Sequence, residues 1–191
     1  MSTKTTSRTP EAGADDLFVH RWSPRAFSCQ PIAEETLTGL FEAARWSPSC
    51  YNAQPWLYVY ADSPEQQARF VEALVPGNQT WAKSAPVLAF LFARKRFEHN
   101  DRDNRWAGFD AGASWMALAL QARLAGLYTH GMAGFDPDKA FEVCDVNPKD
   151  YDVMAAIAVG HMGDPDNLPE QVAAREKPSD RKPLPEVART A

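Results

Sequence analysis

Two arginines and a serine stand at alternating positions near the start of the chain, as Arg21, Ser23 and Arg25. Because Pro24 disfavours the helical conformation of the residue before it, the stretch should be extended, with these three side chains on one side. Two guanidinium groups and a hydroxyl in this arrangement suit a terminal phosphate group. Taken alone, such a stretch is more often a pair of exposed arginines that precedes a helix.

A second polar cluster reads Ser-Pro-Ser-Cys-Tyr-Asn-Ala-Gln-Pro-Trp over residues 47–56 and lies between an expected helix and an expected strand. Loops on a rigid frame often carry binding groups, and Ser49, Asn52 and Gln54 could hydrogen-bond a heteroaromatic ring or its polyol chain. The alternative interpretation is an ordinary turn rich in proline and asparagine.

Other chemistries have weaker support. The histidines, His20, His99, His130 and His161, lie far apart, so no metal site and no zinc enzyme are predicted. No glycine-rich element follows a strand with Rossmann or P-loop spacing, so a nicotinamide cofactor would dock only transiently. Cys50 has no basic neighbour in sequence and is interpreted as a packed thiol rather than a redox nucleophile.

Length and composition indicate one folded domain. A chain of 191 residues would give two halves too small for good cores, and its 45% hydrophobic content is ordinary for a globular protein. The polar start predicts a disordered tail over residues 1–14, followed by a single domain over residues 15–191. The tail lacks the apolar stretch of a secretory signal, and the longest apolar runs are too short to cross a bilayer.

Charge and cysteine content narrow the class further. A net charge of -5 argues against a broad nucleic-acid-binding face, whereas local basic clusters suggest one discrete anion. Three scattered cysteines do not form a disulfide framework, so a cytoplasmic location is expected.

The elements that must position these motifs follow from periodicity and turn signals. Helices are expected over residues 34–46, from 63 to about 76, over 104–124 and over 137–144, and strands over 54–61, 86–93, 128–132 and 153–159. The third helix is apolar nearly all round, which suits a central or subunit-interface helix. After Gly163 the proline-rich chain should form an extended arm. This mixture without a regular βαβ rhythm predicts the α+β class.

The two motifs, at their separation in this chain, resemble those of the nitroreductase family. That family carries Arg-x-Ser-x-Arg/Lys and later Pro-Ser-x-x-Asn-x-Gln-Pro-Trp. The similarity continues through Asn78, 84–86, 110–126, 131–136, 158–160 and 181–184. The resemblance implies a nitroreductase-like FMN-binding fold, with a central mainly antiparallel sheet flanked by helices and an extended C-terminal arm.

The resemblance also implies roles for individual residues. Arg21, Ser23 and Arg25 would hold the phosphate and ribityl end of FMN, with Arg181 reaching the phosphate from the arm. Asn78 would lie near the flavin ring, and residues 132–134 would pass backbone N–H groups across one ring edge. The complete expected FMN-binding set is Arg21, Trp22, Ser23, Arg25, Pro48, Ser49, Cys50, Asn52, Gln54, Asn78, Met132, Ala133, Gly134 and Arg181.

Pro48, Ser49, Cys50 and Asn52 resemble a stretch contributed by the second subunit, so a homodimer with FMN at its interface is implied. The activity implied is hydride transfer from NADH or NADPH to a nitroaromatic or quinone, by a ping-pong mechanism. No catalytic side chain is expected, because flavin N5 carries the chemistry. The alternatives are a flavin-dependent dehydrogenase or reductive dehalogenase, or an FMN-binding sensor or carrier without turnover.

The chain departs from the family pattern at three positions. Trp81 and Ser179 stand where several members have lysine, and Ala133 stands where some have glutamate. These changes alter the charge expected around the flavin, and the acceptor cannot be predicted from them.

Overall fold

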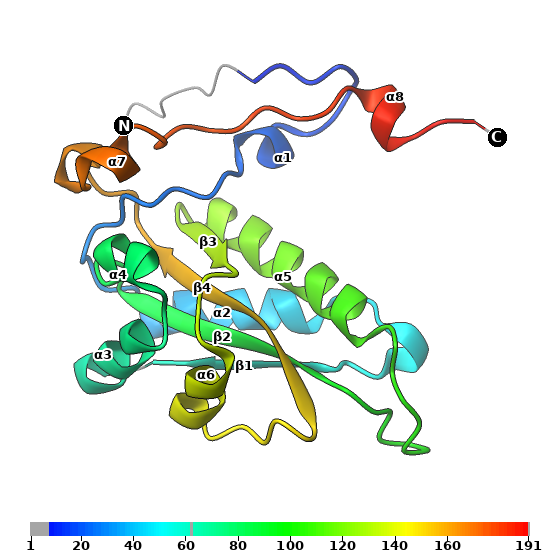
Figure 1. The fold of residues 1–191 in the computed structure, drawn as a ribbon. Coiled ribbons are helices and arrows are strands. Elements are labelled where there is room, and N and C mark those ends of the chain that lie inside the picture. Colours follow the sequence, from blue (N-terminus) through cyan, green and yellow to red (C-terminus); the bar gives the residue numbers. More distant parts are fainter. Residues whose placement is uncertain (1–7, 62, 191) are drawn as a thin grey trace.

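A four-stranded antiparallel sheet forms the centre of the computed structural model, which describes residues 8–61 and 63–190 (Figure 1). Its strands are β1 (Trp56–Tyr60), β2 (Val87–Arg94), β3 (Tyr128–Met132) and β4 (Tyr151–Gly160), in the spatial order β1-β2-β4-β3. All three neighbouring pairs are antiparallel. The expected α+β class and antiparallel sheet are confirmed.

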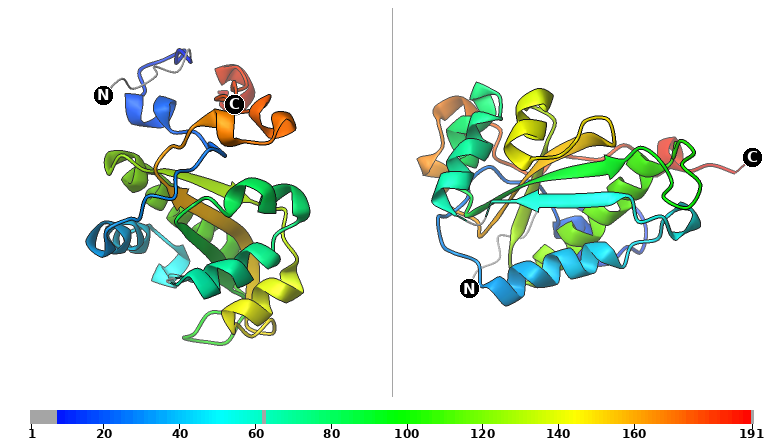
Figure 2. Two further views of the ribbon diagram at one scale, coloured as in Figure 1. Left: turned by 90° about the vertical axis from the view of Figure 1, so that its left-hand side faces the viewer. Right: turned by 90° about the horizontal axis from the view of Figure 1, so that it is seen from below.

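Helices cover both faces of the sheet, as the views in Figures 1 and 2 show. One face packs against α2 (Glu34–Arg45) and α5 (Ala107–Leu124), and the other against α3 (Pro64–Glu72), α4 (Pro76–Ala82) and α6 (Pro137–Cys144). Strand β2 is buried on both faces: Leu88 and Phe90 enter one core, and Ala89 and Leu91 enter the other. This explains its uninterrupted apolar sequence.

Local signals set several helix ends as expected. The Ser63 side chain accepts a hydrogen bond from the Gln66 amide at 3.3 Å, and Pro64 follows at the first helical position. The prediction that this helix continues to about residue 76 was wrong. Because Pro76 disfavours a helical Val75, which is extended at ψ 151, the chain leaves α3 and restarts with Pro76 as the first residue of α4.

Helix α5 has two different faces. Its buried face includes Ala111, Ser114 and Leu118, which pack towards the sheet. Its other face exposes Phe109 by 75% and Leu124 by 68%. Within one chain the nearly all-round apolar helix is therefore buried on one face only. Gly126 follows the helix at φ +76, the left-handed conformation expected of a C-terminal glycine.

The N-terminal segment from residue 8 and the C-terminal arm run side by side above the sheet in Figure 1. The N-terminal segment leads into α1 (Asp16–His20), and the described part of the C-terminal arm carries the short helices η2 (Pro165–Asn167), α7 (Glu170–Ala173) and α8 (Leu184–Val187). The Leu184 amide donates to the Glu11 carboxylate at 3.2 Å, which joins the two ends. Of the expected tail, residues 1–7 lie outside the described residues.

Among residues 8–61 and 63–190, no helix combines the length and apolarity that a membrane span requires.

Candidate functional site

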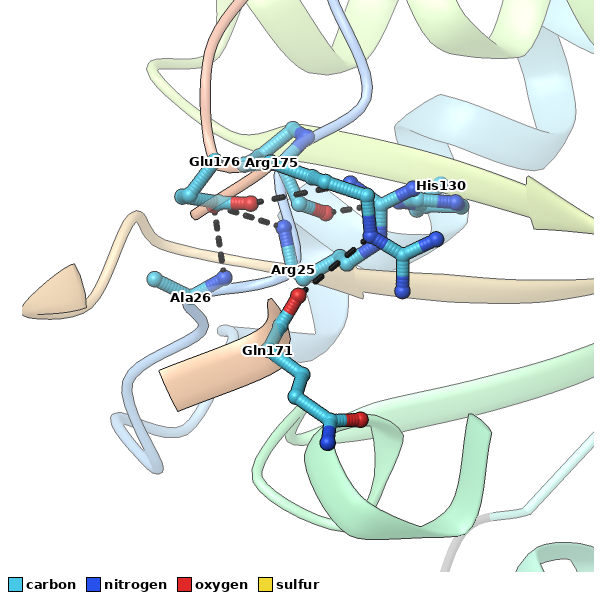
Figure 3. A network of polar contacts seen from close by, with 7 residues as sticks. Arg25, Ala26, His130, Gln171, Arg175 and Glu176 are labelled. Carbon is cyan, nitrogen blue, oxygen red and sulfur yellow. Dashed lines mark hydrogen bonds and ion pairs between the residues drawn. The ribbon is translucent and has the colours of Figure 1, made fainter. Parts of the chain in front are cut away.

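The Arg-Trp-Ser-Pro-Arg segment is fastened on both sides by residues far away in sequence (Figure 3). The His130 ring, on β3, donates from Nδ1 to the Pro24 carbonyl at 2.8 Å. One Glu176 carboxylate oxygen, from the C-terminal arm, accepts the amides of Arg25 at 2.7 Å and Ala26 at 2.9 Å. The Glu176 side chain is only 2% exposed. These bonds fix the backbone from Pro24 to Ala26, immediately after the Arg21–Ser23 stretch.

Arg21 and Ser23 open onto a cavity of about 460 Å³ between α1, α5, β3 and the C-terminal arm. Arg181 reaches the same cavity from the arm, and Trp115, Met116 and Gly131 contribute an apolar wall. Three of the residues expected to bind FMN are thereby brought together. The cavity combines charged and apolar walls, as a site for an amphipathic anion would.

Positive charge is concentrated around Arg21 and Arg181 in the lining of this cavity. Burial lowers the pKa of Arg21, and the neighbouring guanidinium groups of Arg181 and Arg8 lower it further. Burial and Arg181 likewise lower the pKa of Arg8, whereas the Asp180 carboxylate raises it. Three guanidinium groups that repel one another form a site for an anion such as phosphate.

The segment after β3 is fastened to α4. The Asn78 side chain donates from Nδ2 to the Gly134 carbonyl at 2.9 Å, and the Val75 amide donates to the same oxygen at 3.1 Å. A Cβ added to Gly134 would lie 2.6 Å from Asn78 Nδ2 and 2.9 Å from a Val75 methyl carbon, so a larger residue here would force these side chains to shift. Asn78 thus holds the predicted 132–134 segment in place. Met132 is buried, and Ala133 is exposed.

Pro48, Ser49 and Cys50 line a second, apolar cavity of about 300 Å³ at the N-terminal end of α5. Trp106 and Phe109 complete its walls. Within one chain the predicted FMN-binding residues therefore lie in separate places: Arg21, Ser23 and Arg181 at the first cavity, Pro48, Ser49 and Cys50 at the second, and Asn78 with residues 132–134 beside α4.

The loop that follows Cys50 has an unusual backbone. Tyr51, Asn52 and Gln54 have φ values of 53°, 56° and 47°, a region that costs energy for residues other than glycine. The buried Asp110 carboxylate accepts the Cys50 amide at 3.0 Å, and the Ser49 hydroxyl accepts the Gln54 amide at 3.0 Å. These bonds hold the strained loop, on which Asn52 and Gln54 are exposed.

Arg25 is not among the residues that line the first cavity. The chain bends at this residue, which breaks the alternation expected of Arg21, Ser23 and Arg25, and a guanidinium nitrogen of Arg25 lies 3.8 Å from Glu176. Its predicted contact with a phosphate stays a prediction. Trp22, also in the predicted set, packs edge-on against Tyr128.

Sequence reasoning did not identify Arg8, Asp110 or Glu176 as site residues. Each acts on a motif between 13 and 151 residues away, and no local pattern marks such a pairing. Trp81, which stands where several family members have lysine, is buried, and the centroid of its ring system lies 4.6 Å from that of the His130 ring. It forms part of the core rather than a substitute cation.

Comparison with known proteins agrees with the motifs. A family model described as the nitroreductase family matches residues 19–161. A Streptomyces coelicolor protein provisionally named NADH dehydrogenase/NAD(P)H nitroreductase is 32% identical over 177 residues, which cover 81% of this chain and 85% of that protein.

Solved structures give the same result. The crystal structure of an oxidoreductase containing FMN is 43% identical and superposes with a TM-score of 0.90, covering 98% of this chain and 96% of that one. The fold is also shared with an Exiguobacterium sibiricum protein in complex with FMN, at 21% identity and a TM-score of 0.77, over 96% and 100% of the two chains. The chain therefore belongs to the nitroreductase family and is an oxidoreductase.

Proposed function

We propose that this protein transfers hydride from NADH or NADPH, through bound FMN, to a small organic acceptor such as a nitroaromatic or quinone. Family membership confirms the coarser part of this statement, an FMN-dependent enzyme that uses NAD(P)H. The observation that carries the proposal is the cavity in which Arg21, Ser23 and Arg181 meet an apolar wall.

The cavity suits FMN in size and in charge. Its volume of about 460 Å³ falls in the range usual for small-molecule sites, roughly 300 to 1,000 Å³. Arg21, Ser23 and Arg181 would hold the phosphate, because the repelling guanidinium groups there require an anion. Trp115 and Met116 provide the apolar surface that an aromatic ring system needs. Met132, Ala133 and Gly134 would offer backbone N–H groups to one ring edge.

Bound FMN supplies the redox chemistry, accepting hydride from the nicotinamide and passing reducing equivalents to the acceptor. The protein binds and orients the reactants. Since the described residues offer no dedicated dinucleotide domain, we propose that nicotinamide and acceptor occupy one site in turn, which gives ping-pong kinetics.

We further propose a homodimer formed through the exposed face of α5. Phe109, Met116 and Leu124 are exposed apolar residues at helical spacing, and Met116 also borders the first cavity. A second copy on this face would cover the apolar stripe and close the cavity. Pro48, Ser49, Cys50 and Asn52 would then reach the flavin of the partner. The three free cysteines support the cytoplasm as its location.

Steady-state kinetics with NADH or NADPH and either a nitroaromatic or a quinone test the activity. Parallel double-reciprocal plots are expected. Intersecting plots would imply a ternary complex and overturn the shared site, and no turnover by FMN-loaded protein would favour the sensor or carrier. A product survey separates acceptor reduction from dehydrogenation or dehalogenation.

The cofactor site is tested with Arg21→Ala and a matched control, Arg69→Ala. Arg69 is exposed on α3, across the sheet from α5. The Arg21 variant should bind FMN more weakly than the wild type, while riboflavin, which has no phosphate, should bind nearly as before. The Arg69 variant should bind both flavins normally. Equal losses for FMN and riboflavin in the Arg21 variant would contradict the assignment.

A further inference from the structure

Arg8 stands in a segment whose sequence suggests a frayed tail, yet it contacts Arg21, one of the residues that line the proposed FMN cavity. Its Nη2 group donates to the backbone carbonyl of Arg21 at 3.1 Å. Glu11, three residues later, accepts the amide of Leu184 from the C-terminal arm. The N-terminal segment is thereby attached both to the Arg21 motif and to the arm that carries Arg181.

The charge around Arg8 is not balanced within the described chain. The guanidinium group of Arg181 lowers the pKa of Arg8, and Arg8 in turn lowers the pKa of Arg21; the Asp180 carboxylate raises the pKa of Arg8. Three positive groups and one carboxylate leave an excess of two positive charges. A dianionic phosphate would neutralise this excess.

One donor of Arg8 also lacks an acceptor. The Nε atom is buried and has no hydrogen-bond partner among the described residues. A buried donor of this kind is costly unless it is paired, and charge makes the cost larger. The Arg21 carbonyl occupies Nη2 and leaves Nε for another oxygen.

We propose that Arg8 is a third guanidinium ligand of the FMN phosphate, so that the N-terminal segment 8–15 straps the cofactor into its cavity. This inference rests on the proposed FMN site. It assigns to the chain's first described residue a role in holding the cofactor, in addition to Arg21 and Arg181 from the motifs.

The test compares FMN and riboflavin affinities of the apoprotein by flavin fluorescence. Arg8→Ala should weaken FMN binding roughly tenfold, the equivalent of one charge-assisted hydrogen bond, and leave riboflavin binding unchanged. Arg8→Gln, which keeps a donor for the Arg21 carbonyl but removes the charge, should show the same selective loss if the variant with alanine is poorly folded. Inorganic phosphate should raise the Tm of the wild-type apoprotein more than that of either variant.

The possible outcomes distinguish a failure of the Arg8 assignment from a failure of the proposed FMN site. If Arg21→Ala loses FMN selectively and the Arg8 variants do not, Arg8 is not a ligand and the FMN site stands. If the Arg8 variants lose FMN and riboflavin equally, Arg8 serves the fold. If Arg21→Ala also fails to distinguish the two flavins, the phosphate site itself is misassigned.

Discussion

Replacing Glu176 by alanine should release the segment that presents Arg21 and Ser23 to the cavity. The carboxylate accepts two backbone amides, from Arg25 and Ala26, and each such charge-assisted bond contributes about 1.5 to 3 kcal/mol. The Arg25 guanidinium, at 3.8 Å and partly exposed, adds at most about 1 kcal/mol. Two such bonds correspond to about 3 to 6 kcal/mol, so we expect the free energy of unfolding to fall by about that amount, or the segment to open locally instead.

Two measurements distinguish these outcomes. Urea denaturation gives the global change, and amide hydrogen exchange at Arg25 and Ala26 reports local opening. Glu186→Ala is the matched control, because Glu186 is an exposed carboxylate of the same arm, paired with Lys182 at 3.9 Å, and should cost less than about 0.5 kcal/mol. Wild-type stability together with wild-type exchange at both amides in the Glu176 variant would refute the reasoning.

Three further results are expected. Phe109→Glu should place a charge on the apolar face of α5 and give monomers in sedimentation; an unchanged dimer would place the interface elsewhere. Burial lowers the pKa of His130 to about 4, with Arg25 adding to the shift and the Pro24 carbonyl opposing it. As pH falls from about 6.5 to 4, the unfolded state therefore binds a proton before the folded state does, and the free energy of unfolding should drop by up to about 3 kcal/mol. This part of the pH dependence of stability should be missing when His130→Gln is denatured over the same pH range. Gly134→Ala should cost about 1 to 3 kcal/mol through its clash with Asn78 and weaken FMN binding, whereas Gly39→Ala, with open space around it, should be neutral or stabilising.

Much of the local structure is decided by short stretches of sequence. Helix α6 occupies the predicted residues because Asp136 caps its first turn, accepting the amides of Asp138 and Lys139, and Pro137 suits the first helical position. Strand β2 follows from an apolar run of strand length. The break between α3 and α4 shows the limit of such signals, since a proline can end one helix or begin the next.

The sequence by itself also determined the family, because two motifs at a fixed separation are specific where either one alone is common. It could not determine which side chains of the first motif reach the cavity and which do not. Alternation along an extended strand puts Arg21 and Arg25 on one side, but a bend turns Arg25 towards Glu176, a residue from the other end of the chain.

Only the tertiary structure placed Arg21 and Arg181 in the lining of one cavity, with Arg8 beside them. The tertiary structure also placed Asp110 and Glu176 where they hydrogen-bond the loops at Cys50 and Arg25, which are distant from them in sequence. The physical reason is that helix caps and strand periodicity arise from contacts within a few residues, whereas an anion site requires charges converging from distant segments. Such convergence depends on how the two chain ends pack over the sheet, and no short stretch of residues encodes it.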